Sequence, residues 1–389
     1  MKTKIITRSV WILSLISLLT DVASEMLYPV MPVYLKSIGF SIILIGVLEG
    51  VAEATAGLSK GYFGNLSDNT GRRLPFIQTG YALSAISKPM MAIFVYPLWI
   101  FFSRTIDRLG KGIRTGARDA LLSDEATPET KGRVFGFHRS MDTLGAAIGP
   151  LLALIYLAYN PEDYKFLFII AFLPGMLAVA LTFFIKEKSK QHIEQKKRTR
   201  LLDFIKYWKT SPPVYRKLVS GLLLFTLFNS SDIFLLLKIK ESGYSDVTVI
   251  AVYIFYNLVF AVFSYPLGSL ADKIGMKTTL LIGLILFALT YAGMAFADNQ
   301  ILFYILFFLY GIYAAATEGI AKAWISNICD RKNTATAIGT YTAFQSIAAL
   351  IASSAAGLIW YYFGASSAFL LSAGITVVVI FYISRIENI

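Results

Sequence analysis

A short polar pattern occurs twice in this chain, and the two copies lie about half a chain apart. The first copy reads GNLSDNTGRR at residues 64–73, and the second reads GSLADKIGMK at residues 268–277 of 389. Each copy lies in a short polar break between two long apolar segments. Self-similarity at a fixed offset is the mark of an internal structural repeat. The chain is therefore predicted to form two similar membrane bundles joined in tandem.

The amino-acid composition supports a membrane protein independently of the repeat. The chain is 56% hydrophobic and 15% charged, whereas soluble domains carry about 25% charged residues. Apolar segments of about 20 residues recur along it, and each is long enough to cross a hydrocarbon core about 30 Å thick. We predict an all-α membrane protein with twelve transmembrane helices at 9–36, 41–63, 74–95, 97–120, 132–158, 165–186, 215–239, 245–267, 277–297, 300–326, 335–361 and 365–385.

The twelve spans are expected to form two pseudosymmetric six-helix bundles, an N-terminal bundle at 1–186 and a C-terminal bundle at 215–389. The net charge of +12 is densest in the stretch between them, a basic linker at 187–214. Because Lys and Arg favour cytoplasmic loops, the linker and both termini are placed in the cytoplasm. Orientation and attraction to anionic lipid explain the basic excess, so no nucleic-acid partner is expected. We predict a multi-pass monomer of the cytoplasmic (inner) membrane.

Ionisable side chains inside the spans indicate where the chemistry lies, because such residues are costly in a bilayer. Asp21 and Glu25 lie one helical turn apart in the first span. At 100° per residue, five cations of the fourth span share one sector of about 120°; they are Arg104, Arg108, Lys111, Arg114 and Arg118. A stripe of this kind must face the bundle interior or a water-filled cavity. Asp107 and Lys88 are as well suited to a structural ion pair as to function.

The C-terminal half carries fewer charges within its spans. The sequence NSSD at 229–232 interrupts the seventh span and predicts a discontinuous helix at a binding site. Other polar candidates are Tyr253 and Asn257 in the eighth span, Glu318 and Lys322 in the tenth, and Gln345 in the eleventh. Glu318 and Lys322 are four residues apart and are also suited to pairing with each other.

The repeated pattern Gly-x-Leu-x-Asp-x-x-Gly-x-basic resembles the signature loop between the second and third helices of the major facilitator superfamily. The resemblance extends to chain length, span number and the tandem repeat, and it implies the MFS fold. It also implies that the first, fourth, seventh and tenth helices line a central cavity, and that Asp68 and Arg72 form a cytoplasmic charge relay. The second copy keeps Asp272 but has Met276 in the place of Arg72.

These features predict a secondary active transporter that moves a small anionic solute by alternating access, coupled to protons. A guanidinium group binds carboxylate or phosphate with two parallel hydrogen bonds, so an organic carboxylate, a phosphorylated metabolite or an anionic metal–carboxylate chelate would fit. The substrate-binding residues are expected to be Arg104, Arg108, Glu25, Tyr28, Arg139, Asp232, Tyr253, Asn257 and Gln345. Proton coupling is assigned to Asp21, Glu25 and Asp142, and gating to Asp68, Arg72, Arg114, Arg118 and Asp272.

Three alternatives stand beside this prediction. A proton-coupled multidrug or cation efflux antiporter, with Asp21, Glu25 and Glu49 as counter-charges, is the alternative transporter. A membrane-embedded enzyme would need a nucleophile–base pair or a metal cluster. The chain has only His138, His192 and Cys329 for such chemistry, so no enzyme activity, cofactor or metal is expected. A channel or receptor is disfavoured by the tandem bundles with their signature loops.

Overall fold

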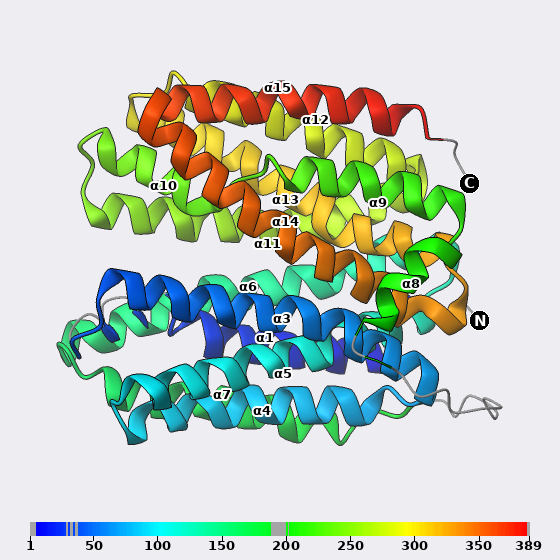
Figure 1. The fold of residues 1–389 in the computed structure, drawn as a ribbon, viewed down its shortest axis with the longest axis horizontal. Coiled ribbons are helices and arrows are strands. Elements are labelled where there is room, and N and C mark those ends of the chain that lie inside the picture. The colour runs from blue at the N-terminus through cyan, green and yellow to red at the C-terminus, as the bar shows by residue number, and fades with distance from the viewer. Residues whose placement is uncertain are drawn as a thin grey trace. The chain divides into compact units, whose positions relative to one another are not determined.

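The computed structural model describes all residues except 1–4, 29, 32–33, 36–37, 188–199, 201 and 387–389, and within helices it leaves undescribed the side chains of 42–47, 49–50 and 246. The side chain of Glu49, His192 and much of the basic linker expected at 187–214 therefore lie outside the described residues. Throughout the described ranges the chain forms helices joined by short connections, with no strand (Figure 1).

The first half contains six long helices: α1 (Arg8–Glu25), α3 (Ile42–Thr70), α4 (Leu74–Ile93), α5 (Pro97–Asp124), α6 (Lys131–Tyr159) and α7 (Tyr164–Thr182). The short helix α8 (Asp203–Thr210) lies in the linker. The second half contains α9 (Pro213–Thr226), α10 (Asp232–Glu241), α11 (Asp246–Ile274), α12 (Met276–Met294), α13 (Gln300–Ile328), α14 (Thr334–Phe363) and α15 (Ala365–Ser384). Single 3-10 turns, Pro128–Thr130 and Arg331–Asn333, lead into α6 and α14 respectively.

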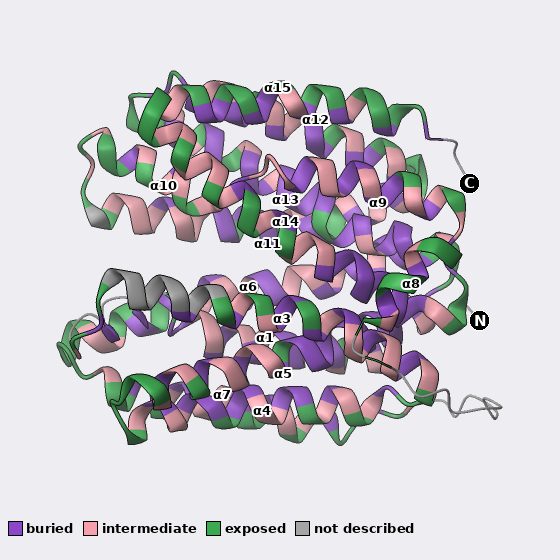
Figure 2. Ribbon diagram, in the orientation of Figure 1, coloured by how far each residue is buried: buried purple, intermediate pink, exposed green. Residues whose placement is uncertain are grey.

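Seven helices of the described part are long and apolar enough to cross a membrane: α6, α7, α11, α12, α13, α14 and α15. The fourth predicted span, now α5, does not meet this criterion because its charged stripe lowers its hydropathy. Large apolar side chains are exposed, such as Leu173 of α7 at 64% and Phe381 of α15 at 65%. Exposed residues, coloured green, recur along α15 in Figure 2. Side chains of this kind are stable in contact with lipid tails rather than with water.

Contacts divide the chain into two compact units. Unit 1 comprises Met1–Ala126, Met141–Thr210 and Asp330–Ala343, and unit 2 comprises Thr127–Ser140, Ser211–Cys329 and Phe344–Ile389. Within unit 1, α4 packs on α5 and α7, α3 packs on α5, and α1 packs on α7. Within unit 2, α12 packs on α13 and α15, α11 packs on α13, and α9 packs on α15. The same packing scheme occurs twice, as the sequence repeat predicts for two pseudosymmetric bundles.

The seventh predicted span is interrupted, as its polar sequence indicated. Helix α9 ends at Thr226, and α10 begins at Asp232 with the Ser231 side chain as its N-cap. The first predicted span, 9–36, is also not one helix, because α1 ends at Glu25. Pro29 and Pro32 follow in the sequence, and proline disfavours helical backbone in the residue before it and removes a helical N–H. The two interruptions occupy nearly equivalent positions of the repeat.

Glycine residues bring α5 against α4 and so place its charged stripe. A Cβ atom on Gly80 would lie 2.6 Å from the carbonyl oxygen of Gly110, and one on Gly110 would lie 2.6 Å from the carbonyl oxygen of Gly80. No larger residue fits at this crossing without moving the backbone. The close approach puts polar groups of α4, including Ser84 and Lys88, within reach of the charged side chains of α5.

Candidate functional site

A polar pocket in unit 1 brings together the charged residues of α1 and α5. It is lined by Asp21, Ser24, Glu25, Tyr28, Arg104, Asp107, Arg108, Lys111 and Arg114. The pocket lies where α1 ends, so residues on both sides of the interruption contribute to it. Four of the five cations of the α5 stripe line the pocket, and only Arg118 does not. Four cations thus face three carboxyl groups in one enclosed polar space.

Asp107 belongs to an ion pair that joins α4 to α5. The Lys88 ammonium lies 2.7 Å from Asp107 Oδ1, and both side chains are buried. Arg104 Nη1 is 3.8 Å from the other carboxylate oxygen of Asp107. A buried charge of either sign would be strongly destabilising without a partner. Asp107 and Lys88 therefore compensate each other, which was one of the two interpretations left open by the sequence.

The two cations nearest the end of the stripe also have protein partners. Arg114 Nη1 donates a hydrogen bond to Ser84 Oγ at 2.8 Å, and its guanidinium lies 4.6 Å from the centre of the Tyr81 ring. Arg118 pairs with Asp119 at 2.9 Å and donates to Ser17 Oγ at 3.2 Å. Neither arginine contacts Asp68, although the sequence made them candidate partners of that carboxylate. Both are held within unit 1 by α4 and α1 instead.

The expected coupling residues Asp21 and Asp142 meet between α1 and α6. Their side chains form a hydrogen bond with each other. Ser17, one turn before Asp21 on α1, donates a hydrogen bond to Asp142 Oδ1. An ionised carboxylate can only accept hydrogen bonds, so this hydrogen bond forms only when one of the two carboxyl groups carries a proton. Glu25, the third expected coupling residue, lines the pocket near Asp21.

The remaining expected substrate-binding residues belong to unit 2. Asp232 is the first residue of α10 and accepts a hydrogen bond from the Tyr310 hydroxyl at 2.5 Å. Asn257 is buried, and its amide donates to the carbonyl oxygen of Tyr253 at 3.0 Å. Gln345 lies on α14 and is half-buried. Tyr310, the partner of Asp232, belongs to a cluster of aromatic rings contributed by α9, α11, α12 and α13.

Arg139 is the cationic member of this group, and its partner comes from another helix. Its guanidinium forms an ion pair with Glu318 of α13. It also lies 4.9 Å from the centre of the Phe260 ring. The carboxylate of Glu318 was considered from sequence only together with Lys322 on the same helix. The pair with Arg139 required the packing of α6 against α13 to become visible.

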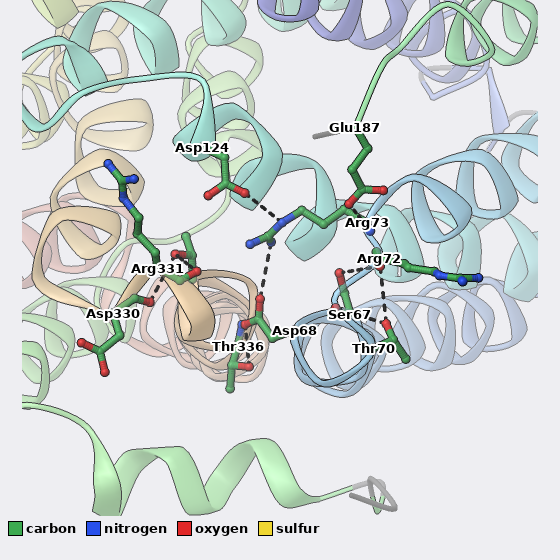
Figure 3. A network of polar contacts seen from close by, with 11 residues as sticks. Ser67, Asp68, Thr70, Arg72, Arg73, Asp124, Glu187, Asp330, Arg331 and Thr336 are labelled. Carbon is green, nitrogen blue, oxygen red and sulfur yellow. Dashed lines mark hydrogen bonds and ion pairs between the residues drawn. The ribbon is translucent and has the colours of Figure 1, made fainter. Parts of the chain in front are cut away.

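The signature-loop carboxylate Asp68 binds the start of α14. Its Oδ2 accepts hydrogen bonds from the backbone N–H of Thr336 at 2.6 Å and from the Thr336 hydroxyl at 2.8 Å. The basic partner is Arg73, whose Nη1 lies 3.4 Å from Asp68 Oδ1. The structure pairs Asp68 with Arg73 and not with the expected Arg72. The side chain of Arg72 points away from Asp68 in Figure 3 and makes no contact with it. Arg73 is buried, whereas Arg72 is exposed.

Arg73 connects Asp68 to two further acidic groups (Figure 3). Its Nε lies 3.1 Å from the Asp124 carboxylate at the end of α5. Its backbone N–H and that of Leu74 donate to the two oxygens of Glu187 at 2.7 and 3.1 Å. Glu187, at the beginning of the linker, thus caps the N-terminus of α4. One arginine therefore ties together the ends of α3 and α5 and the start of α4.

The second signature-loop carboxylate, Asp272, makes the equivalent contact with α6. Its oxygens accept hydrogen bonds from the backbone N–H groups of Gly132 and Arg133 at 2.7 and 3.0 Å. Arg133 Nε also lies 3.0 Å from Asp272 Oδ2. At the spacing of the repeat, Arg133 is equivalent to Thr336, so each carboxylate binds the N-terminus of the equivalent helix. Helix N-termini carry exposed N–H groups and a partial positive charge that favour such an anion.

Sequence reasoning missed several members of these networks. Arg73 adjoins the predicted Arg72, and burial rather than sequence position distinguishes the two. Thr336 lies one repeat offset from Arg133, but this relation points to Thr336 only after the structure has shown Asp272 bound to the start of α6. Ser17 and Glu187 carry no signal beyond their polarity. Among the described residues, no group of three or more His, Cys, Asp or Glu side chains lies close enough to hold a metal ion.

Because Asp68 and Asp272 bind the starts of different helices, removing each carboxylate should destabilise only the helix start that it binds. Asp68→Ala should speed amide hydrogen exchange at the first turn of α14 by about fivefold, because a cap is worth about 1 kcal/mol. Asp272→Ala should do the same at the first turn of α6. Hydrogen-exchange mass spectrometry of both purified variants measures the effect, and each variant is the control for the other. Faster exchange at both helix starts in one variant would contradict separate capping roles.

Comparison with known proteins identifies the family. The sequence profile of the Major Facilitator Superfamily matches residues 13–256 and 233–387. An uncharacterized MFS-type transporter of Methanocaldococcus jannaschii is 32% identical over 361 residues, which is 91% of this chain and 89% of that protein. A multi-drug resistance efflux pump PmrA homolog of Lactococcus lactis is 23% identical over 318 residues, covering 79% of this chain and 77% of the relative.

A solved structure shows the same fold. The crystal structure of the human organic anion transporter MFSD10 superposes with a TM-score of 0.81 at 17% sequence identity, covering 97% of this chain and 99% of that one. At this identity the similarity concerns the fold alone. The profile match and the archaeal relative, together with the duplicated signature loops, identify the chain as a multi-pass membrane transporter of the Major Facilitator Superfamily with its twelve-helix fold.

Proposed function

We propose that this chain is a secondary active transporter that moves a small anionic solute by alternating access and couples its movement to protons. The observation that carries the proposal is the pocket of unit 1, in which the cationic stripe of α5 faces the interrupted end of α1. Organic carboxylates, phosphorylated metabolites and anionic metal–carboxylate chelates are the solutes whose charge and size suit it. We place the protein in the cytoplasmic membrane, with both termini in the cytoplasm. We propose that it acts as a monomer.

The charge balance of the pocket favours an anion. Four cations face three carboxyl groups. Asp107 is bound at short distance by Lys88, which does not line the pocket, and Asp21 shares a hydrogen bond with Asp142. These contacts reduce the negative charge that Asp107 and Asp21 present to a solute. Arg104 and Arg108 then present the positive charge, and guanidinium groups bind carboxylate or phosphate with high directional specificity.

The residues of unit 2 are proposed to complete substrate recognition. Asp232, beside the break between α9 and α10, is equivalent in the repeat to Tyr28, which lines the pocket in unit 1. Interrupted helices in corresponding positions of two repeats are frequent at transporter binding sites, because the freed backbone groups bind the solute. Arg139, Tyr253, Asn257 and Gln345 are proposed to act with Asp232.

A proton-coupled efflux antiporter for drugs or organic cations is the second candidate. The relative from Lactococcus lactis bears the name of an efflux pump and matches over most of this chain. Glu25 lines the pocket and is the carboxyl group best placed to act as a counter-charge there. A cation would nevertheless have to enter beside four basic side chains, so the anionic solute is favoured.

The first test identifies the charge of the solute. A ligand that binds the native state raises the melting temperature of the purified protein, so a panel of organic anions and organic cations should separate the two candidates. Arg104→Lys and Arg108→Lys should each weaken binding of a stabilising anion about tenfold or more, because a charge-assisted hydrogen bond is worth about 1.5–3 kcal/mol. Isothermal titration measures the affinity.

Arg216→Lys on α9, which lies outside the pocket, is the matched control and should bind the anion like the parent. Unchanged affinity in both pocket variants would contradict an anion site at these arginines. Stabilisation by organic cations alone would favour the efflux candidate instead.

The second test concerns proton coupling by Asp21, Glu25 and Asp142. Asp21→Asn removes one of the two carboxyl groups that share a proton, so it should abolish proton-driven accumulation of the anion in proteoliposomes. Exchange between two loaded compartments should continue, because exchange needs no net proton movement. Tracer uptake with and without a pH gradient measures both. Accumulation at the parental level would show that Asp21 is not the coupling group.

The third test concerns gating by the signature-loop networks, for which Asp68, Arg72, Arg114, Arg118 and Asp272 were expected. We propose that the contacts of Asp68 and Asp272 hold the cytoplasmic side closed and break when the N- and C-terminal bundles rock. Arg73→Gln should increase labelling of cysteines introduced on the cytoplasmic side of the cavity and decrease labelling on the outer side, in a Cys329→Ser background. The reason is that the Asp68 network loses its buried cation.

Arg72→Gln provides a matched control at the neighbouring position, because the exposed Arg72 does not contact Asp68. It should label like the parent, whereas Asp68→Asn should label like Arg73→Gln. Equal labelling in the Arg72 and Arg73 variants would argue against a gate built on Arg73 and leave Asp68 with only its contact to the start of α14.

A further inference from the structure

A buried row of polar side chains runs from α5 through α1 to α6 inside unit 1. Arg118 of α5 is paired with Asp119 through Nη2 at 2.9 Å and Nε at 3.0 Å. Its Nη1 donates to Ser17 Oγ on α1 at 3.2 Å. Ser17 Oγ in turn donates to Asp142 Oδ1 on α6, and Asp142 is hydrogen-bonded to Asp21. A single hydroxyl thus joins an ion pair on one side to a pair of carboxyl groups on the other.

The backbone packing holds this row in place. A Cβ atom on Gly145 of α6 would lie 3.1 Å from the Cβ of Asp21, so α6 approaches α1 closely one turn from Asp142. Ser17 and Asp21 are four residues apart and project from the same face of α1. Ser17, Arg118, Asp119 and Asp142 are all buried. The hydroxyl of Ser17 therefore has little freedom to exchange its partners for water.

The hydrogen-bond directions assign a role to this hydroxyl. A serine hydroxyl has one proton to donate and two lone pairs. Arg118 supplies N–H donors only, so Ser17 accepts from Arg118 and its single proton goes to Asp142 Oδ1. A carboxylate oxygen that accepts a hydrogen bond is stabilised in its ionised form. Ser17 therefore favours release of the proton shared by Asp142 and Asp21.

We infer that Ser17 is a positioning residue for proton exchange, which orients Asp142 toward Asp21 and links the two carboxyl groups to Arg118. The inference rests on the proposed proton coupling at Asp21 and Asp142 and adds a residue that does not itself carry the proton. When the carboxyl pair binds or releases a proton, its charge changes, and Arg118 is linked to that charge by the Ser17 hydroxyl. Proton binding between α1 and α6 is thereby connected to the part of α5 around Arg118.

Other charged and titratable groups around the row interact electrostatically with its members. Glu25 on α1 and Lys111 on α5 both act on Asp21. Tyr81 on α4 acts on Arg118. Ser17 contacts Asp142 and Arg118, so replacing Ser17 removes these two contacts and leaves Glu25, Lys111 and Tyr81 in place.

Infrared spectroscopy of the purified protein in lipid vesicles tests the inference with protons as the only ligand. The carbonyl stretch of protonated carboxyl groups is followed as a function of pH, and the signal lost in Asp142→Asn and in Asp21→Asn identifies the pair. Ser17→Ala should shift the midpoint of this signal upward by about one pH unit, since a lost hydrogen bond to a charged group corresponds to about one unit or more. Ser17→Thr, which retains the hydroxyl, should restore the parental midpoint.

Ser14→Ala is the matched control, because Ser14 is a buried serine one turn away on α1 whose hydroxyl makes no hydrogen bond. It should titrate like the parent. An unshifted midpoint in Ser17→Ala, or an equal shift in Ser14→Ala, would overturn the role of Ser17. These results do not depend on the transported solute. If Asp21→Asn keeps proton-driven accumulation while Ser17→Ala still shifts the signal, the proposed coupling fails and the positioning role stands.

Discussion

Neutralisation of buried charge determines most side-chain contacts of α5. A charged group removed from water is stable only with a partner of opposite charge or several hydrogen bonds. Lys88 forms an ion pair with Asp107, and Asp119 forms one with Arg118. Arg114 contacts the Tyr81 ring and the Ser84 hydroxyl. These partners come from α4 and from α5 itself, which explains why the glycines at the crossing of α4 and α5 are needed. On the pocket side, four cations of α5 line the same space as Asp21, Glu25 and Asp107, and we propose that this surface binds the solute.

The two signature loops show one solution used twice. Asp68 and Asp272 each place a carboxylate at the first turn of a long helix, where backbone N–H groups have no partner within the helix. Each contact combines backbone N–H donors with one side-chain donor of the helix start, the Thr336 hydroxyl for Asp68 and the Arg133 guanidinium for Asp272. The first network has an added arginine, Arg73, whereas the second uses Arg133 from the capped helix itself.

The groups that we propose for proton exchange and for solute binding are close neighbours in unit 1. Asp21 lines the pocket and is also bonded to Asp142, so a proton gained or lost by the carboxyl pair changes the charge of the pocket wall. Coupling by this arrangement would need no long pathway, since electrostatic interactions are strong over a few ångströms in a medium of low dielectric constant.

The sequence by itself determined the architecture. The duplicated loop, the apolar segment lengths and the sparse charges predict two six-helix bundles, and the polar NSSD stretch predicts the break between α9 and α10. Helical periodicity alone also grouped the cations of α5 on one face. These features depend on local spacing and on the cost of charge in lipid, both of which can be evaluated along the chain.

Only the tertiary structure decided which charges meet. It selected Arg73 over the adjacent Arg72, tied Arg114 and Arg118 to α4, α5 and α1 rather than to Asp68, and joined Arg139 to Glu318. It also ended α1 at Glu25 and placed Ser17 between Arg118 and Asp142. The reason is geometric: a hydrogen bond or ion pair forms only over about 3–4 Å, and residues far apart in the sequence reach that distance only through the packing of their helices.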